Sequence, residues 1–330
     1  MTDQSSIPDP ALAAPPADQT PWERWRTPFP LWWVAVAAVV GLLLAYPTGM
    51  LLQHKIDDDA DFAPAAVAQG QSRAVAIAAA LVNREVEING WTANDPFPTP
   101  GWALDNMPNF QMGIVAAAAR FAGALADETG QVNGPAAVDN ELSRAAGLLR
   151  YPGTVWKFDP RTAWARTASA EKQYRLAVRS LESYNEHVAA GTATFDRRAA
   201  VAAGVLAAVA HDLESLAEAA DRHMADHHWA LFDLKADDVF YGAKGRLYAY
   251  GLMLRELGRD ISPLLGSRQL AGQWNDMVEA FRAAGQLEPL VVLNGSPDAT
   301  LMPSHVASQG FLGERARMRV LQMAEALRRG

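Results

Sequence analysis

The segment from Asn89 to Gln111 holds the densest group of residues that could do chemistry. Its sequence, NGWTANDPFPTPGWALDNMPNFQ, joins two predicted helices and is rich in Trp, Asn, Asp and Pro. A loop of this length inside a compact domain is often functional. Asp95 and Asp105 have the side chains that could share the acid and base roles in hydrolysis of a glycosidic bond. The segment therefore contains one candidate catalytic pair.

The same segment also carries residue types that bind sugars or peptides. Indole rings offer flat apolar platforms, and carboxamides both donate and accept hydrogen bonds. The candidate ligand-binding residues are Trp91, Asn94, Trp102, Asn106 and Asn109. A structural interpretation covers the same residues, because Asn and Asp cap helices, Pro fixes turns and Trp packs over helix ends. Both interpretations stay open, and the pattern favours the structural one.

A histidine pair near the end of a long predicted helix is a second candidate. His223 and His227 stand four residues apart, so they share one helix face. Such a pair can hold zinc, but the Glu of an H-E-x-x-H motif is absent and no third ligand is identifiable. Histidines in a last helical turn also interact favourably with the negative end of the helix dipole. We expect no metal site, and the sequence leaves the role of the pair open.

Tyr241 and Lys244 lie about one helical turn apart, where an ammonium group could assist a phenol in acid–base chemistry. The similar pair of short-chain dehydrogenases has four-residue spacing and needs a nucleotide-binding sheet, and this chain has neither that spacing nor a G-x-G-x-x-G turn. We expect Lys244 to lie along its helix with the ammonium in water. Phosphate-loop and G-x-S-x-G motifs are absent too, so no cofactor is expected.

Composition excludes several classes of function. The chain has 330 residues, no cysteine, and 29 Lys plus Arg against 37 Asp plus Glu, which gives a formal net charge of −8. Without cysteine there are no disulfides, thiolate metal sites, iron–sulfur clusters or cysteine nucleophiles. The acidic balance argues against a nucleic-acid partner, which requires clustered Lys and Arg.

An uncharged apolar run begins at Leu31 and ends at Leu52, and the nearest flanking charges are Arg26 and Lys55. A helix of that length would reach about 33 Å, enough to cross a hydrocarbon core of about 30 Å. A buried core helix rarely runs this far without a polar face, and a signal peptide has a shorter apolar stretch and a small-residue cleavage site. We expect this run to span a membrane, with membrane lipid as its partner.

The flanking cations suggest an orientation for this span. Arg24 and Arg26 precede it and only Lys55 follows closely, which favours a cytoplasmic N-terminus. The acidic run from Asp57 to Asp61 could meet divalent cations, but a charge run is usually solvated. The expected organisation is a disordered cytoplasmic tail (1–30), a transmembrane helix (31–52), a juxtamembrane linker (53–64) and a helical domain outside the cytoplasm (65–330).

The remainder of the chain reads as helices separated by Gly and Pro. Residues 169–190 keep apolar side chains at i, i+3, i+4 and i+7 and are followed by Gly191, a typical helix terminator. No run predicts a β-sheet. The expected helices cover residues 65–88, 108 onward, 135–149, 169–190, 196–227, 237–257, 269–284 and 304–328. We therefore predict an all-α domain, a multi-helix bundle outside the cytoplasm.

Four segments together resemble one known family. They are WTANDPFPTPGWALDNMPNFQ, SLESYNEHVAAGTATFDRR, DDVFYGAKGRLYAY and VVLNGSPDATLMPSH, and LDNMPNFQ is the most specific motif. They are similar to the domain of unknown function 2333 family of single-pass envelope proteins of Gram-negative bacteria. The resemblance implies a proteobacterial inner-membrane protein with a helical periplasmic portion. It implies no catalytic residues.

Two classes of function follow. The first is a non-catalytic envelope module that binds an envelope protein, a lipid carrier or the cell wall, and it is favoured because no catalytic constellation is complete. The alternative is a cell-wall or glycan hydrolase with its site at residues 89–111 and Asp95 and Asp105 as the carboxylate pair. A hydrophobic ligand between the helices is a third option, which no specific pattern favours.

Overall fold

The computed structural model describes residues 31–158, 165–226, 234–287 and 305–329. The chain divides into two units, one ending at Pro47 and one beginning at Thr48, and each is treated by itself. The α-helices are α1 (Leu31–Gln53), α2 (Arg73–Asn83), α3 (Asn106–Asn133), α4 (Asn140–Leu149), α5 (Ala170–Ala190), α6 (Ala199–Asp226), α7 (Leu234–Asp260), α8 (Ser262–Ser267), α9 (Ala271–Gly285) and α10 (His305–Arg329). Within the described residues there is no strand, only an isolated bridge between Phe158 and Arg166, so the predicted all-α class is confirmed.

Helix α1 is the candidate membrane anchor. Two described helices are long and apolar enough to cross a bilayer, in the segments Trp32–Gln53 and Ala199–Arg222. The second lies in α6 and is mostly buried inside the protein, as expected for a core helix, whereas the first is not buried at all. A signal sequence meets the same length and composition criteria. The predicted tail, residues 1–30, lies outside the described residues.

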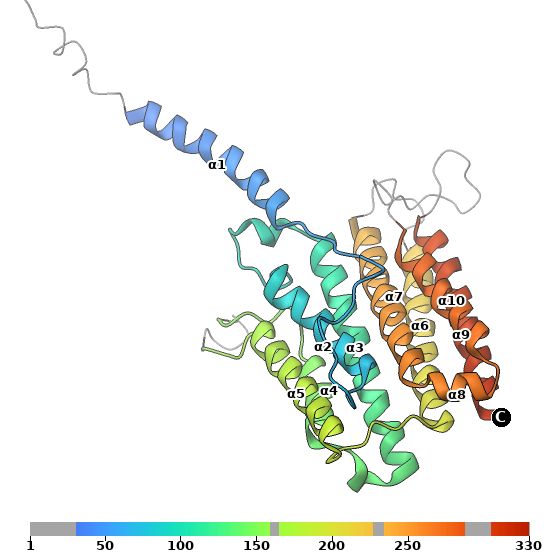
Figure 1. Cartoon of the computed structure of the whole chain (residues 1–330). Helices are drawn as coiled ribbons and strands as arrows, with labels where there is room; N and C mark the ends of the chain where they lie inside the picture. The colour runs from blue at the N-terminus through green and yellow to red at the C-terminus, as the bar shows by residue number, and fades with distance from the viewer. Residues whose placement is uncertain (1–30, 159–164, 227–233, 288–304, 330) are drawn as a thin grey trace, which may run out of the picture. The chain divides into compact units, whose positions relative to one another are not determined.

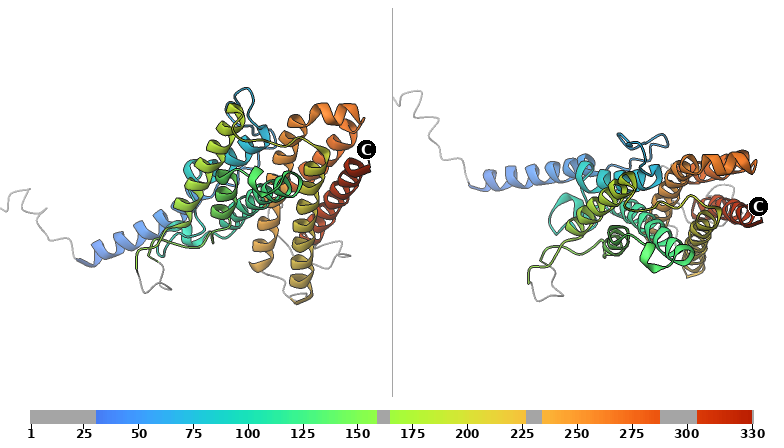
Figure 2. Two further views of the ribbon diagram at one scale, coloured as in Figure 1. Left: turned by 90° about the horizontal axis from the view of Figure 1, so that it is seen from below. Right: turned by 60° about the horizontal axis from the view of Figure 1, so that its bottom comes forward.

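The unit that begins at Thr48 is a bundle built from two groups of helices. Helices α2, α3, α4 and α5 pack together in one group, and α6, α7, α9 and α10 form the other (Figures 1 and 2). The seam between the groups is the contact of α3 with α7, with further contacts of α3 with α6 and of α2 with α7. Long helices from both groups thus meet along α3.

Helix boundaries follow local capping. The helix predicted at residues 169–190 is confirmed as α5, and Gly191 ends it with a left-handed φ of 72°. The helix predicted to begin at residue 65 begins only at Arg73, because the Ser72 hydroxyl accepts a hydrogen bond from Val75 N and fixes the start there. Its last part, Arg84–Ile88, is a π-helix, a rare form that the sequence pattern does not reveal.

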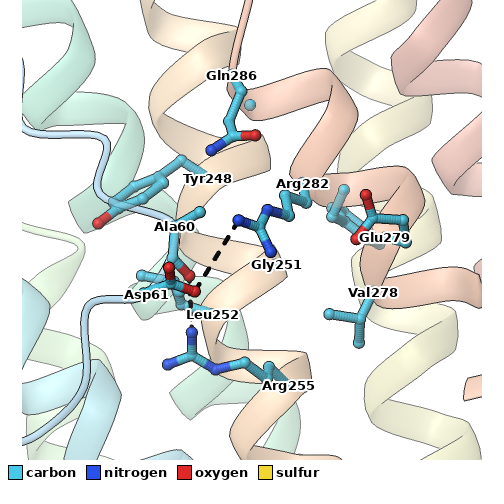
Figure 3. A pocket seen from close by; sticks show the side chains of 12 residues that line it. Ala60, Asp61, Tyr248, Gly251, Leu252, Arg255, Val278, Glu279, Arg282 and Gln286 are labelled. Carbon is cyan, nitrogen blue, oxygen red and sulfur yellow. Dashed lines mark hydrogen bonds and ion pairs between the residues drawn. The ribbon is translucent and has the colours of Figure 1, made fainter. Parts of the chain in front are cut away.

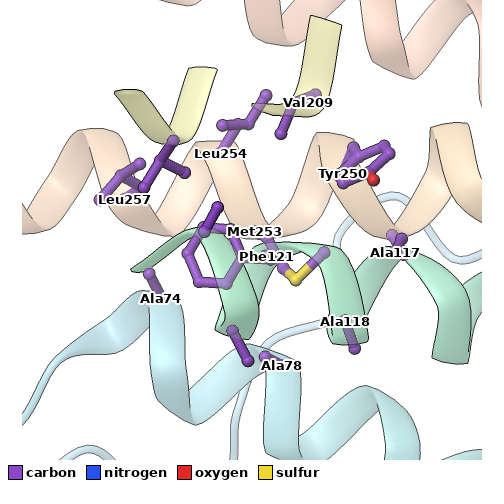
Figure 4. Packing of buried hydrophobic residues seen from close by; sticks show 14 of the residues in the cluster. Ala74, Ala78, Ala117, Ala118, Phe121, Val209, Tyr250, Met253, Leu254 and Leu257 are labelled. Atoms are coloured by element: carbon purple, nitrogen blue, oxygen red, sulfur yellow. The ribbon is translucent and has the colours of Figure 1, made fainter. Parts of the chain in front are cut away.

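Buried apolar side chains, both large and small, pack between the helices at the seam. In Figure 4, Phe121 of α3 and Met253 of α7 fill the space between these helices, while Ala74 and Ala78 of α2 face α3. All four side chains are buried, so they belong to one continuous apolar core. Such a core supplies most of the favourable free energy of folding.

The closest approach of α3 and α7 is made by glycines. A Cβ atom at Gly113 of α3 would lie 2.3 Å from the Gly242 carbonyl oxygen of α7. A Cβ atom at Gly245 would lie 2.1 Å from the Phe110 carbonyl oxygen. Both distances are far below van der Waals contact, so the two backbones touch directly at this crossing. Arg246 follows Gly245, and its position is therefore set by the crossing.

Residues 57–61, here called the acidic strap, are docked on the bundle. The expectation of a solvated charge run was wrong for two of its four carboxylates: Asp58 Oδ2 lies 2.6 Å from Lys244 Nζ, and Asp57 Oδ1 lies 3.3 Å from Arg84 Nη1. Lys244 is buried rather than extended into water, because this ion pair and a 2.9 Å hydrogen bond to the Leu287 carbonyl oxygen compensate its desolvation. Backbone carbonyl oxygens of Asp57, Asp59 and Ala60 accept hydrogen bonds from Arg84, Tyr248 and Arg255, respectively.

Asp196 joins the end of α3 to the start of α6, and this contact predicts an acid-sensitive contribution to stability. Hydrogen bonds from Arg198, and then from Asn133, lower the pKa of the Asp196 carboxyl to about 2. Because the pKa is lower in the folded state, the stabilisation is present above the unfolded pKa near 4 and is lost as the pH falls toward 2. We expect the Asp196→Asn variant to melt below the wild-type protein at pH 7 and the difference to vanish near pH 2. Circular dichroism melts across that range test this, and a difference independent of pH would contradict it.

Candidate functional site, an arginine-lined cleft

Trp91 and Asn94, two candidate ligand-binding residues of the loop from Asn89 to Gln111, connect this loop to other parts of the bundle. The buried indole of Trp91 donates a 2.9 Å hydrogen bond to the Gly153 carbonyl oxygen and packs edge-on against Tyr174, with ring centroids 4.9 Å apart. Asn94 is also buried, and its amide donates to the Val155 carbonyl oxygen at 2.8 Å. These two side chains therefore hold the loop against the segment between α4 and α5.

The two candidate catalytic carboxylates contact different neighbours. Asp105 is exposed, and its carboxylate accepts a 2.8 Å hydrogen bond from Asn106 N, so it caps α3. Asp95 is partly buried, and burial, together with the nearby negative charge of Glu171, raises the pKa of its carboxyl. Asp95 also lies against Gly101, where a Cβ atom would come within 1.8 Å of Asp95 Oδ2.

The remaining candidates of the loop lie at the start of α3 and just before it. Asn109 donates to Asp238 Oδ1 of α7 at 2.6 Å, which links the two helices. Asn106 is partly buried, and Trp102 is exposed on the short 3-10 turn Pro100–Ala103. His227 and the side chain of His223 lie outside the described part of the structure. In the described part, no group of three or more His, Asp or Glu residues could hold a metal ion.

A cleft of about 540 Å³ opens between the two helix groups. This volume lies within the range of about 300–1,000 Å³ typical of small-molecule sites. Five helices or their ends contribute to it, namely α3, the end of α4, α5, α6 and α7. Its lining residues are Met112, Val115, Ala116, Ala119, Arg120, Leu149, Arg150, Tyr151, Gly153, Tyr174, Asp212 and Arg246.

The charges of this cleft are opposite in sign to those of the chain. Three lining arginines face one lining carboxylate, a formal charge of +2 in a chain whose net charge is −8. Asp212 accepts a 2.7 Å hydrogen bond from the Tyr250 hydroxyl and lies 3.3 Å from Arg246 Nη1 and 3.8 Å from Arg120 Nε. Burial raises the pKa of Tyr250, and the negative charge of Asp212 raises it further. The phenol therefore stays protonated and donates its hydrogen bond to Asp212. Asp212 thus holds two arginines in place.

Arg150 is the third cation of the cleft and has no such carboxylate. Its guanidinium lies against α3, where a Cβ atom at Gly123 would come within 2.5 Å of Arg150 Nη2. Within the described residues, no ion pair or side-chain hydrogen bond engages this guanidinium. Because a guanidinium presents its donors in a fixed fork, Arg150 is prepared to bind a planar carboxylate or a phosphate.

The loop from Asn89 to Gln111 packs against one wall of this cleft through Trp91. Gly153 lines the cleft, and a Cβ atom there would lie 2.9 Å from Trp91 Cζ2 and 3.3 Å from the Tyr174 hydroxyl. The Tyr174 hydroxyl in turn donates to the Tyr151 carbonyl oxygen at 2.7 Å. Trp91 therefore fixes the shape of one wall without lining it.

Sequence reasoning did not single out the three arginines, because they come from segments far apart in the chain. One signal was available at Arg120, the only charged residue between Met107 and Ala126. A lone cation in so apolar a helix must either pair inside the protein or face a cleft. Arg150 and Arg246 carry no comparable signal.

A second pocket lies between α7 and α9, and Ala60 and Asp61 of the acidic strap form part of its lining (Figure 3). Its volume is about 90 Å³, too small for most ligands. Arg255 donates to the Ala60 carbonyl oxygen at 2.7 Å, and Arg282 lies 4.0 Å from Asp61. Its two arginines thus already face the strap, unlike Arg150 in the larger cleft.

Comparison with known protein families gives a match. The model of a family described as an uncharacterized protein conserved in bacteria, DUF2333, matches residues 34–228. This range includes most of α1 and every lining residue of the cleft except Arg246. No curated protein and no solved structure matches the chain. Because the family match covers more than half of the 330 residues, the chain belongs to the DUF2333 family of conserved bacterial proteins.

Proposed function

We propose that this protein is a non-catalytic envelope module, anchored in the bacterial inner membrane by α1, that binds an acidic ligand in the arginine-lined cleft. The observation that carries the proposal is the group of Arg120, Arg150 and Arg246 around a cleft with a single carboxylate. The apolar, exposed α1 supports the anchor, and the cations before it support a periplasmic position for the bundle.

The rest of the lining indicates which ligand the cleft would take. Met112, Val115 and Leu149 are apolar, while Tyr151 and Tyr174 add aromatic surface. An anionic group held by guanidinium donors, joined to a short apolar part, matches this surface in both charge and polarity. The ligand class is therefore a small amphipathic carboxylate or phosphate.

Binding without catalysis fits the side chains that are present. The described lining contains no Ser, Thr, Lys or His to act as nucleophile or base. Its one carboxylate, Asp212, already accepts from Tyr250 and pairs with Arg246. At the predicted loop, the different contacts of Asp95 and Asp105 give no support to the hydrolase alternative.

A charge-removal experiment tests the proposal. We expect the full-length protein in neutral detergent to bind hexyl phosphate, and Arg150→Gln to weaken that binding about tenfold, because one charge-assisted contact of about 1.4 kcal/mol is lost. Isothermal titration calorimetry measures both affinities, and the wild-type affinity should fall as salt is raised.

Arg144 supplies the matched control. It lies on α4, which Arg150 follows directly, but it is exposed, pairs with Glu141 at 3.5 Å and does not line the cleft. Arg144→Gln should therefore bind hexyl phosphate as the wild-type protein does. Equal binding by the Arg150 and Arg144 variants, or no binding by the wild-type protein, would contradict an acidic-ligand site in this cleft.

A further inference from the structure

Phe97 and Trp102 form an exposed aromatic pair that no packing in the domain requires. Their side chains are 71% and 56% exposed, and their rings meet edge-on with centroids 5.1 Å apart. Exposing two large aromatic side chains together to water costs free energy, so we expect them to be buried against another surface. Both residues belong to the short segment that precedes α3.

This aromatic pair lies beside the last turns of α1, in the unit that begins at Thr48. A Cβ atom at Gly49 would lie 2.7 Å from Pro100 Cγ, and one at Gly101 would lie 3.2 Å from Gln53 Oε1. The segment that carries Phe97 and Trp102 is therefore packed on the helix where the predicted span ends. Leu51 and Leu52, the final apolar residues of that span, are exposed in the same unit.

We propose that Phe97 and Trp102 insert into the lipid–water interface and give the domain a second contact with the bilayer. The inference rests on the proposed anchoring by α1. The apolar run ends at Leu52 and is followed by exposed His54 and Lys55, so the interface falls at this level of the helix. Trp is enriched at that depth, because its ring is apolar while its N–H can meet headgroups and water, and Phe97 adds apolar surface beside it.

Photo-crosslinking in a bilayer tests the contact. The full-length chain carrying benzoylphenylalanine in place of Phe97 is reconstituted into vesicles of phosphatidylethanolamine and phosphatidylglycerol, irradiated, and analysed by mass spectrometry. We expect an adduct with lipid. The new side chain is aromatic and position 97 is exposed, so the variant should fold, which a circular dichroism spectrum verifies.

Two further positions calibrate the result. Val39, in the middle of α1, should give lipid adducts if the helix spans the bilayer. Val132 is partly exposed at the far end of α3, about 39 Å along that helix from Asn106, and should give none.

Each outcome is decisive. Lipid adducts at positions 97 and 39 but not at 132 support the inference. Adducts at position 39 alone would overturn it and leave the anchor intact, whereas no adduct at position 39 would overturn both. An adduct of position 97 with a second polypeptide would show that a protein, instead of lipid, covers the aromatic pair.

Discussion

Replacing Gly245 with alanine is expected to destabilise the bundle by about 3 kcal/mol, at the upper end of the range for overpacked sites. The added methyl carbon would lie 2.1 Å from the Phe110 carbonyl oxygen and 3.2 Å from Ile114 N. These are backbone atoms of α3, so no side-chain rotation can relieve the clash, and the two helices must separate. Thermal and denaturant unfolding of the full-length protein in neutral detergent, followed by circular dichroism, measure the loss.

Gly245→Ala should also change the geometry of the cleft. Arg246 follows Gly245 on α7 and lines the cleft together with Arg120 of α3, so a displaced α7 moves one cationic group relative to another. We therefore expect Gly245→Ala to weaken hexyl phosphate binding as well as stability.

Gly147 gives the opposite expectation and serves as the control. It lies in α4, is exposed, and has no atom within 4 Å of a Cβ built on it. Gly147→Ala should therefore raise stability by about 0.5–1 kcal/mol, because alanine loses less backbone entropy in a helix. If both alanine variants were stabilised, α3 and α7 would not be in backbone contact at Gly245.

Removing Arg84 is expected to cost about 3–5 kcal/mol, the range for breaking a buried ion pair. Arg84 and Glu85 are 3% and 0% exposed on the π-helix, and Arg84 Nη2 lies 2.9 Å from Glu85 Oε1. Arg84 also donates to the Tyr248 hydroxyl at 2.9 Å and to the Asp57 carbonyl oxygen at 2.7 Å. Arg84→Met leaves the Glu85 carboxylate buried without its cation. Equilibrium unfolding measures the cost.

Two comparisons distinguish the loss of stability caused by the unpaired buried charge from a nonspecific destabilisation. Burial raises the pKa of Glu85, opposed by the charge of Arg84, so without Arg84 the carboxyl takes up a proton more readily. Because the pKa is then higher in the folded state, the deficit of Arg84→Met should shrink as the pH is lowered. Arg175 pairs with Glu87 of the same π-helix at the surface, so Arg175→Met should cost less than about 1 kcal/mol. Equal losses in the two variants, at every pH, would contradict a buried charge effect.

Properties encoded within one segment could be predicted from the sequence. The amphipathic spacing of residues 169–190 gives α5 and its glycine end, and the uncharged run after Leu31 gives a helix long enough to span a bilayer. Family membership was also expected from several motifs and is confirmed over residues 34–228.

Properties that depend on packing between distant segments could not be predicted. The acidic strap looks like a solvated charge run because its cations, Arg84 and Lys244, lie far along the chain. The cleft likewise exists only after three helices bring their arginines together. Trp91 is a different case: its residue type left ligand binding and packing open, and in the fold its indole packs against Tyr174.

The short passage from α1 to the bundle limits how far this domain can act. Only Gln53 and His54 separate Leu52, the end of the apolar run, from Lys55, whose backbone amide already bonds to Met107 Sδ at 3.2 Å. The acidic strap follows at once and is held by Arg84 and Lys244. With α1 in the bilayer as proposed, no long flexible linker follows the membrane-spanning run. Recognition of a distant cell wall would need such a linker.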